Sequence, residues 1–334
     1  MKIFITGVAG FLGSHLADLM ISEGHTVAGN DNMIGGYADN VPQGVEFHQI
    51  DCCDLENLTK AMEGCDIVYH TAATAYEGLS VFSPVLVTRN IFEASVTTIT
   101  AAIRNKVKRI VYCSSMARYG HHDEMPYKET YECRPQDPYG IAKKAGEDVL
   151  RNLCETHGVD YVIAVPHNIV GPRQKYDDPF RNVMSIMLNR MLQGKQPIIY
   201  GDGEQRRCFS YIDDCLYCLN ALAFQNNVVG EVVNIGPDEE SCTINELAEM
   251  CANETGLNLD TLYHKDRPQE VKVAVCSSDK ARQLLDYKTS TNVRQSVQKT
   301  AEYIRTRGTK KFQYHLPIEI VNEKTPDTWK NKLI

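Results

Sequence analysis

Short apolar runs alternate with stretches of helical periodicity along the first half of the chain. The apolar runs at 2–6, 25–29, 45–51, 67–71, 109–114 and 161–165 predict strands, and helices are predicted near 11–23, 55–62, 85–103 and 138–154. Strands that alternate with helices over this length are typical of a parallel sheet with helices on both faces. We therefore expect an α/β fold built on a doubly wound parallel sheet.

The regular alternation ends near residue 172. Helices are predicted at 182–192, 243–255, 279–285 and 293–305, a strand at 232–235 and a turn at 201–203. These elements indicate a smaller α/β domain interleaved with the sheet. We expect the sheet domain to comprise residues 1–170 and about 208–236, and the smaller domain about 171–207 and 237–315. Residues 316–334 are expected to form a C-terminal extension packed on the surface.

Composition narrows the class of protein. The 334 residues carry a net charge of -8, so the chain lacks the basic excess of a nucleic-acid-binding protein. No apolar stretch is long enough to cross a membrane, and we expect a cytoplasmic protein. The twelve cysteines are scattered, which favours free thiols, and Cys215 and Cys218 have no second pair at zinc-site spacing. No metal site is expected.

The segment TGVAGFLG, from Thr6 to Gly13, lies between the first predicted strand and the first predicted helix. Glycines in such a turn let the backbone approach a pyrophosphate, which the positive N-terminus of the helix then binds. Asp31 follows the second strand, close to the expected spacing of the carboxylate that binds an adenosine ribose. Because a carboxylate there repels a 2′-phosphate, we predict NAD as cofactor in preference to NADP.

Tyr139 and Lys143 are four residues apart in a predicted helix that Pro138 begins, so they share one face. An ammonium beside a phenol favours the phenolate and lowers the pKa of the phenol, which makes the pair a candidate general base. Ligands of doubly wound sheets bind beyond the carboxyl ends of the strands. The residues at those ends, which we expect to gather around the pair, are Gly7, Asp31, Ala72, Ser115 and Asn168.

Six motifs follow one another in a specific order and spacing between residues 2 and 305. They are TGVAGFLG from Thr6, HTAA from His70, SSMARYG from Ser114, Tyr139-x-x-x-Lys143, NIVGPRQ from Asn168 and GDGEQRRCFSYIDD from Gly201. By these motifs the chain resembles the extended short-chain dehydrogenase/reductase family, especially the NAD-dependent nucleotide-sugar epimerases of the UDP-glucose 4-epimerase type. The resemblance implies an NAD-binding Rossmann domain and a nucleotide-sugar-binding domain.

The resemblance also implies roles for individual residues. Tyr139 matches the catalytic base, Ser115 the hydroxyl that bonds the reacting sugar oxygen, and Lys143 the lysine that holds the nicotinamide ribose. The positions that match cofactor contacts are Gly7, Gly10, Phe11, Leu12, Gly13, Asp31, Asn32, Asp51, Cys52, Ala72, Ala73, Asn90, Tyr139, Lys143 and Pro166. The positions that match contacts to the nucleotide sugar are Ser115, Tyr139, Asn168, Asn182, Val183, Arg207, Arg267 and Ala274.

Several positions depart from the family pattern. Met116 and Ala117 stand where the dehydratases carry the Asp-Glu pair that eliminates water, so a 4,6-dehydratase is disfavoured. Arg118 replaces a small aliphatic residue. Ala274 replaces a bulky tyrosine of glucose-restricted relatives, which leaves room for an N-acetyl group. His167 would be an extra acid/base group or a histidine satisfied at the strand end, and we favour the second interpretation.

The expected activity is transient oxidation of a UDP-hexose or UDP-N-acetylhexosamine at C4, followed by reduction from the opposite face. NAD would be tightly bound and regenerated in every cycle. A nucleotide-sugar dehydrogenase or reductase with net redox chemistry is the nearest alternative, and a catalytically inactive NAD-binding protein is a more distant one. Because members of the family often dimerise through the helices near 85–103 and 139–154, we expect a homodimer.

Overall fold

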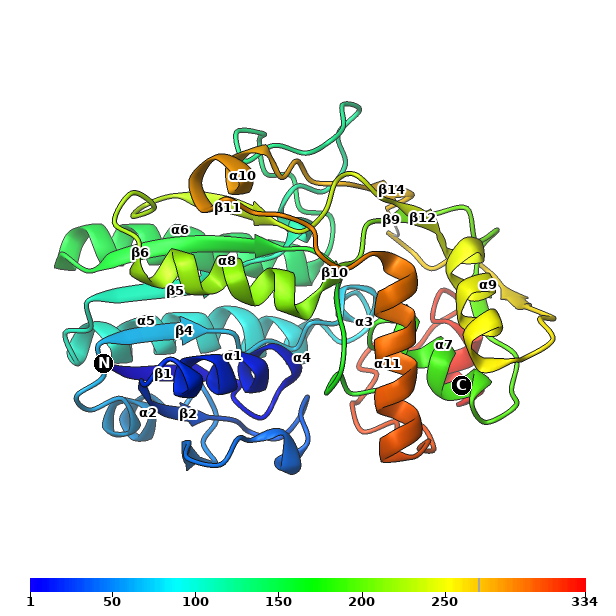
Figure 1. Ribbon diagram of the computed structural model, residues 1–334, viewed down its shortest axis with the longest axis horizontal. Helices are drawn as coiled ribbons and strands as arrows, with labels where there is room; N and C mark the ends of the chain where they lie inside the picture. The colour runs from blue at the N-terminus through cyan, green and yellow to red at the C-terminus, as the bar shows by residue number, and fades with distance from the viewer. Residues whose placement is uncertain (270) are drawn as a thin grey trace.

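A seven-stranded parallel sheet forms the centre of the computed structural model, which describes residues 1–269 and 271–334. The strand order is β11-β6-β5-β4-β1-β2-β3 (Figure 1). The strands are β1 (Lys2–Thr6), β2 (Thr26–Asn30), β3 (Glu46–His48), β4 (Ile67–His70), β5 (Arg109–Cys113), β6 (Asp160–Pro166) and β11 (Val232–Ile235). Every neighbouring pair is parallel, so the predicted doubly wound sheet is confirmed. The direction of winding reverses between β1 and β4, where such sheets bind their ligands.

Helices cover both faces of this sheet. α1 (Phe11–Ser22) and α8 (Ile212–Phe224) pack on one face, and α2 (Leu55–Ala61), α5 (Ala94–Arg104) and α6 (Pro138–His157) pack on the other (Figure 1). Successive strand residues point to opposite faces, so in β4 Tyr69 enters one core and Val68 the other. Both faces are apolar, which explains why the strands read as continuous apolar runs in the sequence.

One predicted helix is divided in the structure. The single helix expected over 85–103 consists of α4 (Pro84–Thr88), a π-helical turn η2 (Arg89–Glu93) and α5. A π-helical turn accommodates an extra residue and so changes the direction of the side chains in it, and such turns are frequent at functional sites. Asn90 lies in this turn and faces the cavity described below. The predicted third strand is also shorter than expected, because pairing at the sheet edge stops at His48.

The second part of the chain folds into small sheets and three helices beside the carboxyl ends of the strands (Figure 1). The helices α7 (Val183–Met191), α9 (Ile244–Thr255) and α11 (Val293–Arg307) share one hydrophobic core. β9 (Arg206–Arg207) lies between β12 (Cys242–Thr243) and β14 (Val273–Ala274), while β7 (Ile169–Val170) pairs with β10 (Ser210–Tyr211) and β8 (Ile198–Tyr200) with β13 (Leu262–His264). A fourth helix, α10 (Asp279–Leu285), precedes α11 in the chain and packs against β11 of the large sheet.

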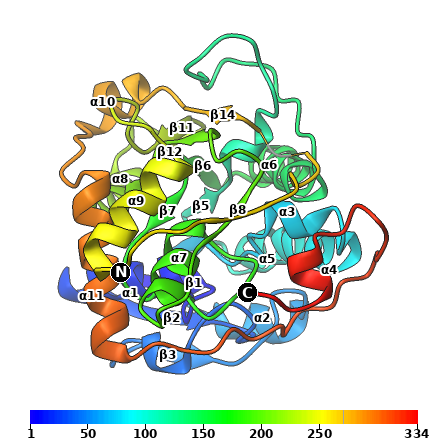
Figure 2. The same ribbon diagram turned by 90° about the vertical axis from the view of Figure 1, so that its right-hand side faces the viewer.

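The C-terminal segment, residues 309–334, lies beside α3 (Glu77–Ser80) and α4 and ends with α12 (Asp327–Lys330) (Figure 2). The carboxylate of Glu319 accepts hydrogen bonds from two backbone N–H groups in the first turn of α4, both at 2.9 Å. The buried ring of Trp329 packs edge-on against Phe82 and Phe180, with ring centroids 6.0 and 5.2 Å away. The segment therefore fastens α3 and α4 to the chain that precedes α7.

A buried ion pair joins the carboxyl end of β5 to α6. The Arg118 guanidinium lies 3.0 Å from the carboxylate of Glu147, and the two residues are 3% and 0% exposed. The other carboxylate oxygen of Glu147 accepts a hydrogen bond from the Ser114 hydroxyl. Arg118 ends the short 3₁₀ helix η3 (Met116–Arg118) that follows β5, so the pair holds this helix against α6. This contact gives a structural role to Arg118, the residue that departs from the family pattern.

Removal of one partner of this pair is expected to destabilise the fold strongly. The Arg118→Met variant leaves the Glu147 charge buried without its partner, which should lower the free energy of unfolding by about 3–5 kcal/mol. In the double variant Arg118→Met/Glu147→Gln no charge is left unpaired, so most of this loss should be recovered. Urea denaturation of Arg118→Met, Glu147→Gln and the double variant measures the free energy of unfolding of each. A double variant whose loss equals the sum of the single losses would contradict this account.

Candidate active site

A cavity of about 470 Å³ runs along the carboxyl ends of the strands and into the second part of the chain. All of the residues that the sequence assigns to cofactor or substrate line it, from Gly7 after β1 to Arg267 and Ala274 in the second part. Their individual roles stay predictions, but the structure places them around one space. His167 does not line the cavity: it is buried, and its imidazole Nε2 lies 3.1 Å from the Pro237 carbonyl oxygen.

The turn between β1 and α1 has the shape that a bound pyrophosphate needs. Gly7 has φ of 72°, and a Cβ atom there would lie 2.9 Å from the Cα of Ala72, so a side chain would be both strained and obstructed. The N-terminal residues of α1 line the same cavity together with Gly10, and the first N–H groups of a helix have no partner within the helix. Backbone N–H groups and the positive end of the helix together favour an anion.

Two polar side chains, those of Asp31 and Asn90, line the cavity near the glycine turn. The carboxylate of Asp31 accepts hydrogen bonds from the N–H groups of Met33 at 2.7 Å and Ala9 at 3.1 Å, which fixes it at the end of β2. Burial raises the pKa of Asp31 although these bonds act in the opposite direction. The buried Nδ2 of Asn90 has no hydrogen-bond partner in the described part of the chain. The glycine turn, Asp31 and this donor fit a dinucleotide such as NAD.

Tyr139 lies in the first turn of α6, where the Asp137 carboxylate caps the helix by accepting the Gly140 N–H at 2.9 Å. Its side chain is 7% exposed and lies on the cavity wall. Burial raises the pKa of Tyr139, although the hydrogen bond with Ser115 acts to lower it. In the protein without cofactor, the expectation of a lowered pKa is therefore wrong, because the loss of water around the phenolate outweighs the favourable contacts.

Lys143, one turn further along α6, is 2% exposed. Its ammonium donates a hydrogen bond to the Cys113 carbonyl oxygen at 2.7 Å and lies 5.4 Å from the centre of the Tyr112 ring. Burial lowers the pKa of Lys143 to about 8. The ammonium is thus anchored to the last residue of β5, and below pH 8 it is charged.

Ser115 lies between β5 and η3. Its hydroxyl accepts the Ala117 N–H at 3.2 Å and caps η3, which leaves the hydroxyl hydrogen available for another acceptor. α6 packs closely against this helix, because a Cβ atom at Gly140 would lie 2.7 Å from the Ala117 carbonyl oxygen. A glycine after Tyr139 therefore lets α6 bring the phenol next to Ser115.

The opposite end of the cavity has polar groups from the second part of the chain. Asn168 adopts a left-handed φ of 44° and donates from Nδ2 to the Cys208 carbonyl oxygen at 2.9 Å. Asn182 caps α7 by accepting the Met184 N–H at 3.0 Å. The Arg267 guanidinium lies over the Tyr200 ring, 4.8 Å from its centre.

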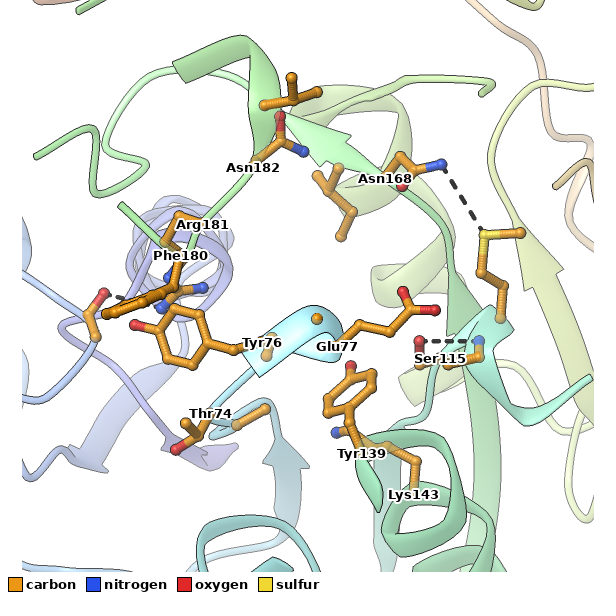
Figure 3. A pocket seen from close by; sticks show the side chains of 18 of the residues that line it. Thr74, Tyr76, Glu77, Ser115, Tyr139, Lys143, Asn168, Phe180, Arg181 and Asn182 are labelled. Atoms are coloured by element: carbon orange, nitrogen blue, oxygen red, sulfur yellow. Dashed lines mark hydrogen bonds between the residues drawn. The ribbon is translucent and has the colours of Figure 1, made fainter. Parts of the chain in front are cut away.

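The residues that line the cavity without a prediction from the sequence include Tyr76, Glu77, Phe180 and Arg181 (Figure 3). In Figure 3 the Glu77 side chain points across the cavity toward Ser115, above the Tyr139 ring. Tyr76 and Glu77 come six and seven residues after the end of β4. Because ligands bind beyond the carboxyl ends of the strands, this position in the sequence could have indicated that they lie near the site. Phe180 and Arg181 lie in an irregular segment before α7, where no pattern in the sequence indicates direction.

Other kinds of site are absent from the part of the chain that the structure describes. No cluster of three or more His, Cys, Asp or Glu side chains suits a metal ion there. Within the same residues, no helix is both long and apolar enough to span a membrane. All twelve cysteines are free thiols, as expected.

Comparisons with known proteins agree with this geometry. A UDP-glucose 4-epimerase of Mycolicibacterium smegmatis is 28% identical over 326 residues, which cover 92% of this chain and all of that protein. The crystal structure of UDP-glucose 4-epimerase from Thermotoga maritima, with UDP-glucose, has a TM-score of 0.86 and 29% identity and covers 92% of this chain and 99% of its own. The UDP-glucuronic acid 4-epimerase of Bacillus cereus, in complex with UDP-glucuronic acid and NAD, has a TM-score of 0.84 and 28% identity, covering 92% and 100%.

The profile of the NAD dependent epimerase/dehydratase family matches residues 3–236, which include β1 to β6, the glycine turn, Ser115, Tyr139 and Lys143. That is more than half of the chain. The protein therefore belongs to the NAD dependent epimerase/dehydratase family, and its cofactor is NAD.

Proposed function

We propose that the protein is a nucleotide-sugar 4-epimerase that acts on a UDP-hexose or UDP-N-acetylhexosamine. The observation that carries the proposal is the placement of Ser115, Tyr139 and Lys143 on one wall of a cavity that also contains the glycine turn and Arg267. The cavity thus offers a proton-transfer group between a cofactor end and a polar end that suits a diphosphate. The small side chain of Ala274 lines the same cavity and supports acceptance of an N-acetyl group.

The mechanism assigns a separate task to each residue. Ser115 donates a hydrogen bond to the C4 oxygen of the sugar, and Tyr139 as phenolate takes the proton of that hydroxyl. Bound NAD would supply the acceptor, and then the donor, of the C4 hydride. The Lys143 ammonium stabilises the phenolate by its charge and would hold a ribose hydroxyl. Tyr139 then returns the proton after the 4-keto sugar has turned its other face, so that no net oxidation results.

The other residues predicted to contact NAD lie at the end of the cavity that contains the glycine turn. The N–H groups beside Gly10 and Gly13 would hold the pyrophosphate, and Asp31 would accept hydrogen bonds from the adenosine ribose. Asn32 donates to the carboxylate of Asp51 at 3.4 Å, which supports this segment as the place for the adenine.

The cytoplasmic location of the protein stays a prediction.

A dehydrogenase or reductase with net redox chemistry is the second candidate, because it would use the same three side chains. A 4,6-dehydratase is less well supported, since Met116 and Ala117 place an apolar wall where that reaction needs an acid and a base. Incubation with UDP-, GDP- and dTDP-sugars separates these candidates. We expect NMR to show a C4-inverted product with no net change in NADH absorbance; accumulation of NADH or of a 4-keto product would favour the rivals.

The Tyr139→Phe variant should lose the proton-transfer group and little else. We expect its kcat to fall by about 10²–10⁴-fold, with KM changed far less, because general acid–base catalysis typically contributes this much. Ser115→Ala should reduce kcat in the same direction. Rates are measured by NMR of the product, and the unfolding temperature serves as control. A Tyr139→Phe enzyme with undiminished kcat would revive the interpretation as an inactive NAD-binding protein.

The pH dependence should reflect Lys143. Its pKa is lowered to about 8, so the ammonium is present below that pH and is lost above it. Loss of this charge removes stabilisation of the phenolate, and kcat is therefore expected to decline as the pH rises past 8. In Lys143→Arg the guanidinium stays charged, so the remaining activity should not show this decline. The test is kcat measured between pH 6 and 10; a wild-type kcat that still rises above pH 9 would contradict the assignment.

A homodimer is also proposed, as expected from the sequence. The surface of α4, η2 and α6 carries exposed apolar side chains, with Val85 70%, Ile141 53% and Phe92 38% exposed. Exposed apolar residues on neighbouring helices are typical of an interface. Ile141→Lys should convert the protein to a monomer in light scattering at micromolar concentration, whereas Val229→Lys, on an exposed apolar residue elsewhere, should not. A monomeric wild-type protein would refute the dimer.

A further inference from the structure

Glu77 is a cavity residue to which the proposed mechanism gives no task. It begins α3, seven residues after the end of β4, and lines the same cavity as Ser115 and Tyr139. Figure 3 shows its carboxylate directed into the cavity toward Ser115, on the side of the Tyr139 ring that faces the substrate end. A carboxylate at this place meets whatever sugar presents its hydroxyl to Tyr139.

The position of Glu77 is fixed by neighbours on both sides. The buried Tyr76 donates its hydroxyl hydrogen to Asp178 at 2.5 Å and packs edge-on against Phe180. At the other end of α3, the Ser80 hydroxyl donates to the Asp137 carboxylate at 3.3 Å. Asp137 is the residue that caps α6, so one hydrogen bond links the helix of Glu77 to the helix of Tyr139. The two helices that carry Glu77 and Tyr139 are therefore connected near these residues.

The charge of Glu77 acts directly on Tyr139. Among the charged groups that change the pKa of Tyr139, Glu77 has the largest effect, and it raises the pKa. Arg181 acts in the opposite direction but has a smaller effect than either Glu77 or Asp137. The Arg181 guanidinium lies 3.9 Å from the buried carboxylate of Asp178, which offsets its charge. Glu77 and Asp137 therefore both act to raise the pKa of Tyr139.

This charge has consequences for the sugar. In a hexose whose C4 hydroxyl contacts Ser115 and Tyr139, the substituents on C3 and C5 flank that hydroxyl, and the Glu77 side chain points toward the same place (Figure 3). A carboxylate accepts hydrogen bonds and cannot donate them once ionised, so it favours hydroxyl groups. A uronate sugar, whose C5 substituent is itself a carboxylate, would bring two like charges together in a partly desolvated cavity.

We propose that Glu77 is a specificity-determining residue of the sugar pocket, which accepts hydrogen bonds from the hydroxyl groups of a neutral hexose and excludes sugars that carry a carboxylate on C5. The inference rests on the proposed 4-epimerase function and adds the substrate class to it. It separates this chain by chemistry from the related structure that was solved with UDP-glucuronic acid.

The test compares two classes of substrate on matched variants. The neutral substrate is UDP-glucose or UDP-N-acetylglucosamine, whichever the wild type epimerises faster, and the anionic substrate is UDP-glucuronic acid. Values of kcat/KM are measured by NMR for the wild type, Glu77→Gln, Glu77→Asp and Glu249→Gln. Glu249 is an exposed residue of α9, so Glu249→Gln makes the same charge change far from the cavity wall. Unfolding temperatures show whether each variant is folded.

The wild type should prefer the neutral sugar. In Glu77→Gln we expect kcat/KM for the neutral sugar to fall about tenfold, as for loss of one hydrogen bond to a charged group. The value for the uronate should rise, so that the neutral-to-uronate ratio falls at least tenfold. Glu77→Asp keeps the charge and should keep discrimination against the uronate, and Glu249→Gln should match the wild type.

Two results would overturn the inference and leave the 4-epimerase function intact. One is a wild type that epimerises the uronate faster than the neutral sugars, and the other is an unchanged ratio in a folded Glu77→Gln enzyme. A folded, NAD-loaded wild type that epimerises no nucleotide sugar at all would instead refute the proposed function, and this inference with it.

Discussion

Two cations are buried where the carboxyl end of β5 meets α6, and the candidate site depends on how they are held. Lys143 is bound to the Cys113 carbonyl oxygen and Arg118 to the carboxylate of Glu147, which lies one turn beyond Lys143 on α6. Burial of an ammonium is unfavourable, and the lowered pKa of Lys143 reflects that cost. These contacts fix the relative positions of β5, η3 and α6, because any shift would separate the charged groups from their partners.

The rest of the site follows from this fixed junction. The close approach of α6 to η3 at Gly140 brings the phenol to Ser115, and the cap of α6 at Asp137 is linked to α3 through Ser80. The C-terminal segment then fastens α4 through Glu319 and packs Trp329 against Phe82 and Phe180. Elements that are far apart in the sequence thus enclose one cavity, and each is connected to the next by a specific contact.

The sequence predicts the part of this arrangement that is governed by local rules. Continuous apolar runs indicate the buried strands, and parallel strands bring their carboxyl ends to one edge of the sheet, so the sequence alone predicts that Gly7, Asp31 and Ser115 meet. The π-helical turn around Asn90 was missed because helical periodicity does not report one extra residue in a turn. The lowered pKa expected for Tyr139 was wrong for the protein without cofactor, since burial is a tertiary property. Glu77 and the partner of Arg118 were equally invisible, because side chains far along the chain decide where they point.

The central claim is that Tyr139 serves a reversible oxidation at C4, in which the hydrogen on that carbon leaves and returns within one binding event. A UDP-sugar labelled with deuterium at C4 tests this most directly, with the product analysed by NMR and mass spectrometry after turnover in ordinary water. The account predicts that the inverted product still carries deuterium at C4. A product that has inverted at C4 with the label lost to water would contradict it, because the hydrogen would then have left as a proton.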